Sequence, residues 1–320
     1  MTTIGTSTRT TPDAPVFGGD AHPLRLAVPK GRMHEEVVAL LAATGLRLGR
    51  SARGYRPSAS LPGVEVKILK PQNIVKMLEA GTRDLGFAGA DWVRELGVED
   101  ALVEVLDTGF DPVRIVVAAP RSVLVREGGG WRLPTPAELG HPIRIASEME
   151  ALTRAWIARR GYAEGRDAVF VRTYGATEVF PPEDADCIVD VTATGATLEA
   201  NDLVVLDEVT RSSTRLYASR AAMEDAGKRR RIDALAMLLA SVLEARGRVM
   251  LEVNVDEAAF ERVAGILPCM REPTVSKLHS GAGYALKAAV KKDVLPELLP
   301  ALKAAGGTDI VITPMVQVVP

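Results

Sequence analysis

Cysteine is nearly absent from this sequence, and so is an excess of charge of either sign. The two cysteines, Cys187 and Cys269, are too few for a disulfide framework or a cysteine zinc site, and they suit a reducing compartment. The formal net charge of −2 provides no overall electrostatic attraction to nucleic acid. We therefore expect a cytoplasmic protein with no nucleic-acid partner.

Long hydrophobic runs are lacking as well. No apolar stretch approaches the roughly 18 residues of a membrane-spanning helix, so we expect no membrane partner. Residues 1–23 are rich in Thr, Gly, Pro and Asp and have no hydrophobic segment like that of a signal peptide, which predicts a disordered tail. The overall composition, 47% hydrophobic and 25% charged, is that of a globular protein with two or three domains.

Several catalytic signatures are missing too. There is no Walker A pattern, no dinucleotide-binding glycine fingerprint, no His-Glu-x-x-His and no Cys-x-x-Cys. The four histidines are scattered along the chain, and none is a candidate catalyst. The candidates for chemistry are therefore carboxylates, arginines and small hydroxylated loops.

The sequence does contain a regular alternation of short apolar runs and amphipathic segments. From Leu24 to Ala218 this alternation predicts an α/β fold with parallel sheets and crossover helices, and its length favours two lobes. The predicted elements include strands at 64–69, 204–206 and 214–218, and a helix at 71–80 that Gly81 ends. From Arg248 the predicted order becomes β-α-β-β-α-β, which is typical of a ferredoxin-like domain.

Three local expectations accompany this alternation. We expect a loop over residues 120–136 because of its glycine run. The spacing of Ser147 and Glu150 predicts a capping box at the start of a helix. The basic run 228–231 precedes a predicted helix, and a solvated surface is favoured there over an anion site.

One stretch is distinctive within the alternation. Cys187 to Val191 is a short apolar run typical of a buried strand, and Thr192 to Thr197 is a loop of small and hydroxylated residues. Backbone amides in such a loop can surround an anion, and a helix beginning near Leu198 would add a favourable dipole. The stretch predicts a strand, a phosphate loop and a helix, although many βα turns are equally rich in small residues.

Two carboxylates accompany this loop. We expect Asp186 and Asp190 near the C-terminal end of the strand, where open α/β sheets bind their ligands. Carboxylates would repel a simple anion. They suit a ligand that also offers hydroxyl groups or Mg²⁺, as a ribose phosphate does.

Cations gather at two other predicted turns. Lys30 and Arg32 flank Gly31 between a strand and a helix, where they would clamp a phosphate or pyrophosphate. Arg53 and Arg56 follow the next break, and the planar fork of arginine suits phosphate oxygens. A solvated basic turn and an ordinary surface loop are the plain alternatives for these two segments.

A third turn is rich in glycine. Gly86 and Gly89, in the stretch that begins at Asp84, would let a ligand approach the backbone closely. Trp92 at its end is expected to pack in the core.

Together these segments resemble one family. The residues from Asp186 to Leu203 read Asp-Cys-Ile-Val-Asp-Val-Thr-Ala-Thr-Gly-Ala-Thr-Leu-Glu-Ala-Asn-Asp-Leu. They closely resemble the phosphoribosyl-pyrophosphate loop of ATP phosphoribosyltransferase, the first enzyme of histidine biosynthesis. The segments at 30–33, 53–57, 84–92 and 174–179 are similar to further elements of that family, and the resemblance covers nearly the whole chain from Leu24.

The resemblance implies a fold and a domain organisation. The expected fold is α/β, with a two-lobed core like the type-II periplasmic binding proteins and a C-terminal ferredoxin-like (ACT-like) regulatory domain of the family's long form. Lobe I is expected over 24–109 plus 220–246, lobe II over 110–219, and the regulatory domain over 247–320.

The resemblance also implies a reaction. N1 of the ATP adenine would attack C1 of the ribose in phosphoribosyl pyrophosphate as pyrophosphate leaves, with Mg²⁺ as cofactor. N1 carries a free lone pair, so the enzyme needs no strong base and acts by positioning and charge stabilisation. Two alternatives remain: a two-lobed sensor that binds a small ligand without catalysis, and a phosphoribosyltransferase for another base.

Site residues follow from matching the motifs. The expected catalytic residues are Arg32, Arg53, Arg56 and Asp190. The expected substrate-binding residues are Lys30, Gly31, Asp84, Gly89, Glu148, Glu178, Asp186, Thr192, Ala193, Thr194, Gly195, Ala196 and Thr197. No metal ligands are assigned.

Regulation is implied by the long form as well. That form is a homo-hexamer, here expected as a hexamer or dimer, and is inhibited by histidine bound at the C-terminal domain. Asn254 and Thr274 are the candidate inhibitor contacts. The family often has Asp near the position of Asn254, and it usually has Gly where Cys269 stands here.

Overall fold

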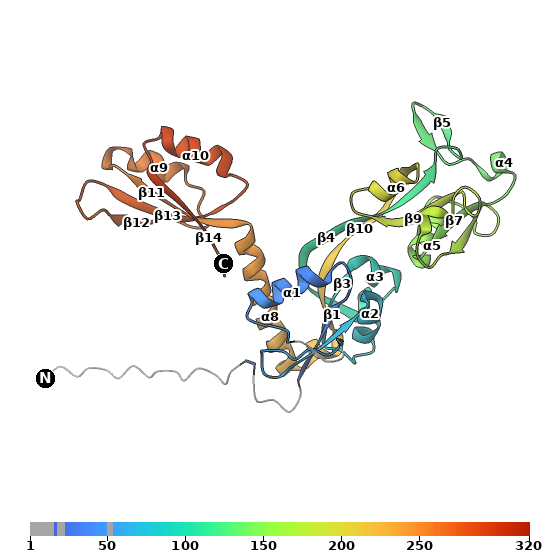
Figure 1. Cartoon of the computed structure of the whole chain (residues 1–320), viewed down its shortest axis with the longest axis horizontal. Helices are drawn as coiled ribbons and strands as arrows, with labels where there is room; N and C mark the ends of the chain where they lie inside the picture. The colour runs from blue at the N-terminus through green and yellow to red at the C-terminus, as the bar shows by residue number, and fades with distance from the viewer. Residues whose placement is uncertain (1–15, 18–22, 50–53) are drawn as a thin grey trace. The chain divides into compact units, whose positions relative to one another are not determined.

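The computed structural model describes residues 16–17, 23–49 and 54–320. The chain divides into two compact units, one within 1–39 and 47–232 and the other formed by 40–46 and 233–320 (Figure 1). In the first unit eight strands form one sheet in the order β2-β1-β3-β10-β4-β9-β7-β8. Their bounds are Leu24–Pro29 (β1), Val64–Leu69 (β2), Leu85–Gly89 (β3), Leu102–Pro120 (β4), Ile143–Ser147 (β7), Ala168–Arg172 (β8), Cys187–Thr192 (β9) and Leu203–Ser219 (β10).

Lobe I is built on β1, β2 and β3. These strands are parallel, as the alternation predicts. Their helices are α1 (His34–Ala43), α2 (Pro71–Glu79) and α3 (Ala90–Glu95). Helix α2 begins with proline at its first position and is followed by Gly81 at φ +65°, the expected start and stop signals.

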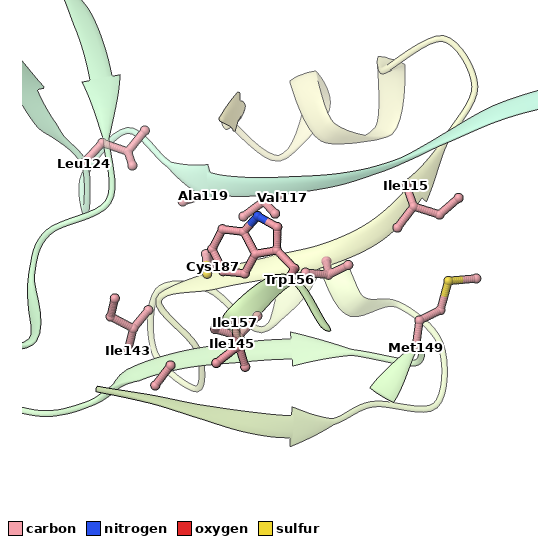
Figure 2. Packing of buried hydrophobic residues seen from close by; sticks show 12 residues of the cluster. Ile115, Val117, Ala119, Leu124, Ile143, Ile145, Met149, Trp156, Ile157 and Cys187 are labelled. Atoms are coloured by element: carbon pink, nitrogen blue, oxygen red, sulfur yellow. The ribbon is translucent and has the colours of Figure 1, made fainter. Parts of the chain in front are cut away.

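Lobe II repeats this plan with the parallel strands β7, β8 and β9. Helix α5 (Glu150–Arg159) packs Trp156 and Ile157 against Ile145 and Val117, as Figure 2 shows. The short helix α6 (Ala196–Ala200) follows the predicted phosphate loop. This apolar core holds the ends of the strands in place.

Strands β4 and β10 correct the expectation of purely parallel sheets. They are the long strands of the unit in Figure 1, and β10 is antiparallel to β3 and β4, while β4 is antiparallel to β9. The two strands expected separately at 204–206 and 214–218 form the single strand β10. Because β4 and β10 pair with strands of both lobes, the lobes share one sheet.

The segment 120–136 is not a simple loop. It contains the hairpin of β5 (Val125–Glu127) and β6 (Gly130–Arg132), and a short helix α4 (Pro136–Leu139) follows. Gly128 and Gly129 have φ of +57° and +84°, so the glycine run makes the tight turn between two strands.

The capping box expected at Ser147 is also wrong. The Ser147 hydroxyl donates to the carbonyl of Val189 and accepts from the amide of Met149, because Ser147 is still the last residue of β7. The first amides of α5, those of Ala151 and Leu152, donate instead to the carboxylate of Glu95 on α3. A side chain of lobe I therefore caps a helix of lobe II.

The basic run 228–231 lies inside helix α8 (Ala226–Arg246), which follows α7 (Arg220–Glu224). It is not uniformly solvated, since Arg231 is only 3% exposed and Lys228 Nζ lies 2.9 Å from Asp84 Oδ1. The helix tolerates these cations near its start because part of their charge is neutralised locally.

The C-terminal unit has the predicted ferredoxin-like topology. Its antiparallel strands run in the order β12-β13-β11-β14. The elements are β11 (Arg248–Val255), η3 (Glu257–Ala259), α9 (Phe260–Ile266), β12 (Thr274–Lys277), β13 (Tyr284–Lys291), α10 (Leu295–Ala304) and β14 (Thr308–Pro314). Alternate residues of β11, such as Leu251 and Val253, are buried against α9 and α10, which leaves the other face of the sheet open. Within the described ranges no helix is long and apolar enough to cross a membrane.

Candidate active site

The carboxyl ends of β1 and β2 form a basic pocket in lobe I. This cavity of about 400 Å³ is lined by four cations together with one aromatic and one amide side chain. They are Lys30, Arg56, Lys67, Lys70, Tyr55 and Asn73. None of the described Asp or Glu residues lines it, so the pocket is suited to an anion with several negative charges.

Two details show how the positive charges are concentrated there. The pKa of Lys67 is lowered first by the positive charge of Arg83, then by burial and by Arg56. Lys30 Nζ lies 5.9 Å from the ring centroid of Tyr55, a cation–π distance. Cations this close together gain from an anion that neutralises them.

Arg32 lies in the same turn as Lys30 but has a different partner. Gly31 gives the turn its left-handed residue, at φ +84°. Arg32 Nε donates to Asp111 Oδ2 at 2.8 Å, and the Arg32 side chain is 60% exposed. Arg53, expected beside Arg56, lies outside the described residues.

The loop after β9 has the predicted strand–turn–helix form. Strand β9 ends at the buried Thr192, Gly195 turns the chain at φ +88°, and α6 begins at Ala196. The Thr194 hydroxyl accepts from the amide of Ala196. Ala193, Ala196 and Thr197 are exposed, so the loop presents its surface to solvent.

A group of carboxylates lies beside this loop. Burial, with a smaller contribution from the negative charges of Glu178 and Glu148, raises the pKa of Asp190 to about 6, against a hydrogen bond from the amide of Val191. Neighbouring negative charges of this kind favour a nearby cation or hydroxyl donors. Among the described residues no cluster of three side chains is arranged to hold a metal by itself. Mg²⁺ bound here would thus depend on substrate phosphates for most of its ligands.

Asp84 and Asp186 each lie at the N-terminal end of a strand, opposite to the carboxyl ends described above. Asp186 immediately precedes β9, so the expectation that it lies near the C-terminal end of that strand is wrong. Its carboxylate accepts from the backbone amide and guanidinium of Arg144. Asp84 precedes β3 and accepts in the same way from Arg25, and also from Lys228. Both are buried, with Asp84 only 1% exposed.

The glycines before α3 are explained by internal packing. A Cβ on Gly89 would lie 2.1 Å from Asp91 Oδ1, and one on Gly86 would lie 2.6 Å from Ile74 Cγ2. The close approach that these glycines permit is made by the protein itself. Trp92 packs against the apolar clusters, as expected.

Comparison with known proteins agrees with this geometry. The family model described as ATP phosphoribosyltransferase matches residues 70–241, and the model of the C-terminal domain of the same family matches residues 245–317. The chain belongs to the ATP phosphoribosyltransferase family. It is the long form, an enzyme of the first step of histidine biosynthesis.

Individual relatives support the same assignment. ATP phosphoribosyltransferase of Desulforudis audaxviator is 35% identical over 302 residues, covering 93% of this chain and 99% of the relative. That of Solibacter usitatus is 35% identical over 301 residues, covering 92% and 99%. A solved chain of the ATP phosphoribosyl transferase (HisG:HisZ) complex of Thermotoga maritima is 26% identical with a TM-score of 0.57, covering 69% of this chain and 98% of that one. The two-lobed core is therefore of the periplasmic-binding-protein type.

Several side chains around the basic pocket and the loop after β9 were not candidates from the sequence. Lys67, Lys70 and Asn73 line the basic pocket, and Arg114 pairs with Thr192 across β4 and β9. Lys70 could have been found, because it directly follows a predicted strand, at the end where α/β sheets bind ligands. Arg114 gives no local signal, since its place depends on the antiparallel pairing of β4.

The regulatory candidates share the open face of the C-terminal sheet. Thr274 lines a cavity of about 600 Å³ there with Cys269 and Lys287. Asn254 is not among the residues lining that cavity, and its Nδ2 donates to Asp309 Oδ2 at 3.1 Å. Residue 254 is Asn and not Asp, but a carboxylate, that of Asp309, lies beside it on the neighbouring strand β14.

Proposed function

We propose that this chain binds ATP and phosphoribosyl pyrophosphate and transfers the phosphoribosyl group to N1 of the adenine, with release of pyrophosphate. The observation that carries the proposal is that the first unit has two different anion-binding edges. Lobe I offers a pocket of cations, and lobe II offers a loop of small residues beside carboxylates. A transfer between two polyanionic substrates needs both kinds of edge.

In lobe II the loop from Thr192 to Thr197 would bind the ribose 5′-phosphate. Its exposed residues and the left-handed Gly195 leave backbone amides accessible, and α6 continues from it. Asp190 would accept hydrogen bonds from the ribose hydroxyls, with Glu148 and Glu178 beside it. Mg²⁺ would bind beside these carboxylates, with most of its ligands supplied by substrate phosphates, and it would neutralise the leaving diphosphate.

In lobe I the basic pocket would bind the phosphates of ATP. Lys30 and Arg56 line it, and Gly31 shapes the turn from which Arg32 extends. Arg32, Arg56 and, beyond the described residues, Arg53 would stabilise the diphosphate as it leaves. We assign Asp84, Asp186 and Gly89 to holding the scaffold, because their contacts are made within the protein.

For regulation we propose that histidine binds the C-terminal unit through Asn254 and Thr274, with Asp309 supplying the negative charge for the ligand's ammonium group. The chain would act as a homo-hexamer or dimer. Its two cysteines are free thiols, which suits an enzyme of the reducing cytosol.

Asp309→Asn should weaken histidine inhibition more than it changes uninhibited turnover. Equal inhibition of both proteins would remove Asp309 from the site.

The reaction is tested by mixing the full chain with ATP, phosphoribosyl pyrophosphate and Mg²⁺ and following the ultraviolet absorbance of the N1-alkylated adenine. Pyrophosphate should appear in equal amount. Binding of both ligands without either product would favour the sensor alternative. Product with another base but not with ATP would favour a different phosphoribosyltransferase.

A further inference from the structure

Asp111 has a backbone conformation that is uncommon for its residue type. Its φ is +52°, in the left-handed region that few residues other than glycine adopt readily. Aspartate is among the side chains that tolerate this region, at some cost. A residue held in this costly conformation is often found at a functional contact.

The strain arises from a bulge in β4. Phe110 pairs with Thr214 and Val113 pairs with Ser212, so two residues of β4, Asp111 and Pro112, lie opposite one residue of β10. A bulge re-aims the side chain that it carries. Here it directs the carboxylate of Asp111 to the turn after β1, where both of its oxygens lie 2.8 Å from Arg32 Nε.

The contact engages only one edge of the guanidinium. Nε of Arg32 is bound by Asp111, while no described residue accepts a hydrogen bond from its two terminal nitrogens. The carboxylate is 15% exposed and the arginine side chain is 60% exposed. The anchored edge is therefore sheltered, and the pair of terminal nitrogens has no acceptor among the described residues, which leaves it available to bind a phosphate in a bidentate manner.

We propose that Asp111 is a positioning residue, which holds Arg32 by its Nε edge so that its two terminal nitrogens are presented to a phosphate group of the substrate. This inference rests on the proposed function, in which Arg32 stabilises the leaving diphosphate. Asp111 itself touches no reacting atom. Its effect is to fix in advance the orientation of a long side chain that would otherwise lose rotamer freedom on binding.

The test is a double-mutant cycle on the full chain. Asp111→Gly removes the carboxylate and suits the left-handed backbone, and it should lower kcat/KM roughly 10- to 100-fold. Asp111→Asn keeps an oxygen acceptor for Nε and should retain most of the activity. In an Arg32→Ala background, Asp111→Gly should have no further effect, because there is no arginine left to position.

A matched control comes from a second aspartate in the same backbone conformation. Asp202 has φ +54° and is exposed. Its side chain makes no hydrogen bond or ion pair with the residues that the structure describes. Asp202→Gly relieves the same strain and should leave kcat/KM unchanged. Thermal melting of each variant separates misfolding from mispositioning, since Asp111→Gly should not lower the melting temperature.

The outcomes are distinguishable. Equal losses from Asp111→Gly with and without Arg32 would overturn the positioning role, as would a gain in kcat/KM in Asp111→Asn, which would make the carboxylate a competitor of the substrate. Normal turnover in Arg32→Ala alone would instead overturn the part of the proposed function that assigns Arg32. An inactive wild-type chain would overturn the proposed function itself.

Discussion

The two lobes are built on the same base and differ at the carboxyl ends of their strands, the edge that we propose binds substrate. In lobe I, Arg25 of β1 binds Asp84, which precedes β3, through its backbone amide and its guanidinium. In lobe II, Arg144 of β7 makes the same contacts with Asp186, which precedes β9. At the other ends of these strands lobe I carries cations, whereas lobe II carries carboxylates and a loop of small residues.

The comparison separates scaffold from chemistry. An arginine–aspartate pair that recurs in both lobes serves what the lobes have in common, which is the spacing of their parallel strands. Features found in only one lobe are the ones to associate with one substrate.

The base of lobe I should be the more sensitive of the two. Asp84→Ala leaves Arg25 and Lys228 without their buried carboxylate and should destabilise the fold by about 3–5 kcal/mol. Asp186→Ala should cost less, because Arg144 and Arg25 are similarly exposed, at 32% and 30%, whereas the loss of Asp84 also leaves Lys228, only 18% exposed, without its carboxylate. Thermal melting measures both. If the remaining folded enzyme showed a changed KM with unchanged melting, these residues would belong to the substrate edge after all.

The substrate edge of lobe II should lose activity when Asp190 is replaced. Asp190→Asn should lower kcat roughly 10²–10³-fold, or about 2.7–4 kcal/mol, as for other groups that act mainly in the transition state. Glu199→Gln on the exposed helix α6 is the nearby control and should change little. Comparable losses in both variants would point to a general electrostatic effect.

The raised pKa of Asp190 predicts opposite pH trends for activity and stability. With the pKa of Asp190 raised to about 6, its ionised form predominates only above that pH, so turnover should rise as the pH passes through 6. The folded state holds this proton more tightly than the unfolded state, so the stability that Asp190 contributes is full at low pH and is lost as the pH rises through 6. Asp190→Asn should therefore gain stability relative to the wild type as the pH rises from about 4 to about 6, and lose the activity step.

The substrate edge of lobe I should affect binding. Lys67→Met and Lys70→Met each remove one cation from the pocket and should raise the KM for ATP by the equivalent of about 1.5–3 kcal/mol. Lys76→Met, on the exposed side of α2, removes the same charge outside the pocket. A similar rise in that control would mean that the net charge of the chain matters and the pocket does not.

The smallest effect concerns the contact between the lobes. Glu95→Ala removes the carboxylate that accepts from the first amides of α5, and loss of a cap costs about 1 kcal/mol. The melting temperature should fall by roughly 2–4 °C. Glu99→Ala, an exposed neighbour whose carboxylate lies 3.8 Å from Arg94, is the control and should change it less.

Much of this architecture could be predicted from the sequence. Strands such as β2 and the helix α2 were expected at their observed positions, because apolar patterning and the proline and glycine signals agree there. The strand that carries the paired arginine in each lobe is also recognisable as a repeat in the sequence, as Leu24-Arg25-Leu26-Ala27 and Ile143-Arg144-Ile145-Ala146, although this repeat was not among the expectations. The phosphate loop also has the expected form.

What could not be predicted depends on pairing across long separations. Strand β10 was divided in two because several register shifts against β4 interrupt its alternation. Arg32 was expected to face only a ligand, and nothing in the sequence around it indicates a partner 79 residues away. Asp84 was assigned to substrate from its motif, whereas its neighbours Arg25 and Lys228 become apparent only once β3, β1 and α8 are assembled.

The pairing of β3 with β10 has a consequence for how the chain is made. Leu85 of β3 meets Ala218 of β10, so the N-terminal lobe keeps one open sheet edge until the whole of the other lobe has left the ribosome. An unpaired edge strand is prone to pair with other chains. During synthesis the edge of β3 that faces away from β1 must therefore stay unpaired while more than a hundred later residues are added, and truncated products that end before β10 should be the ones that aggregate.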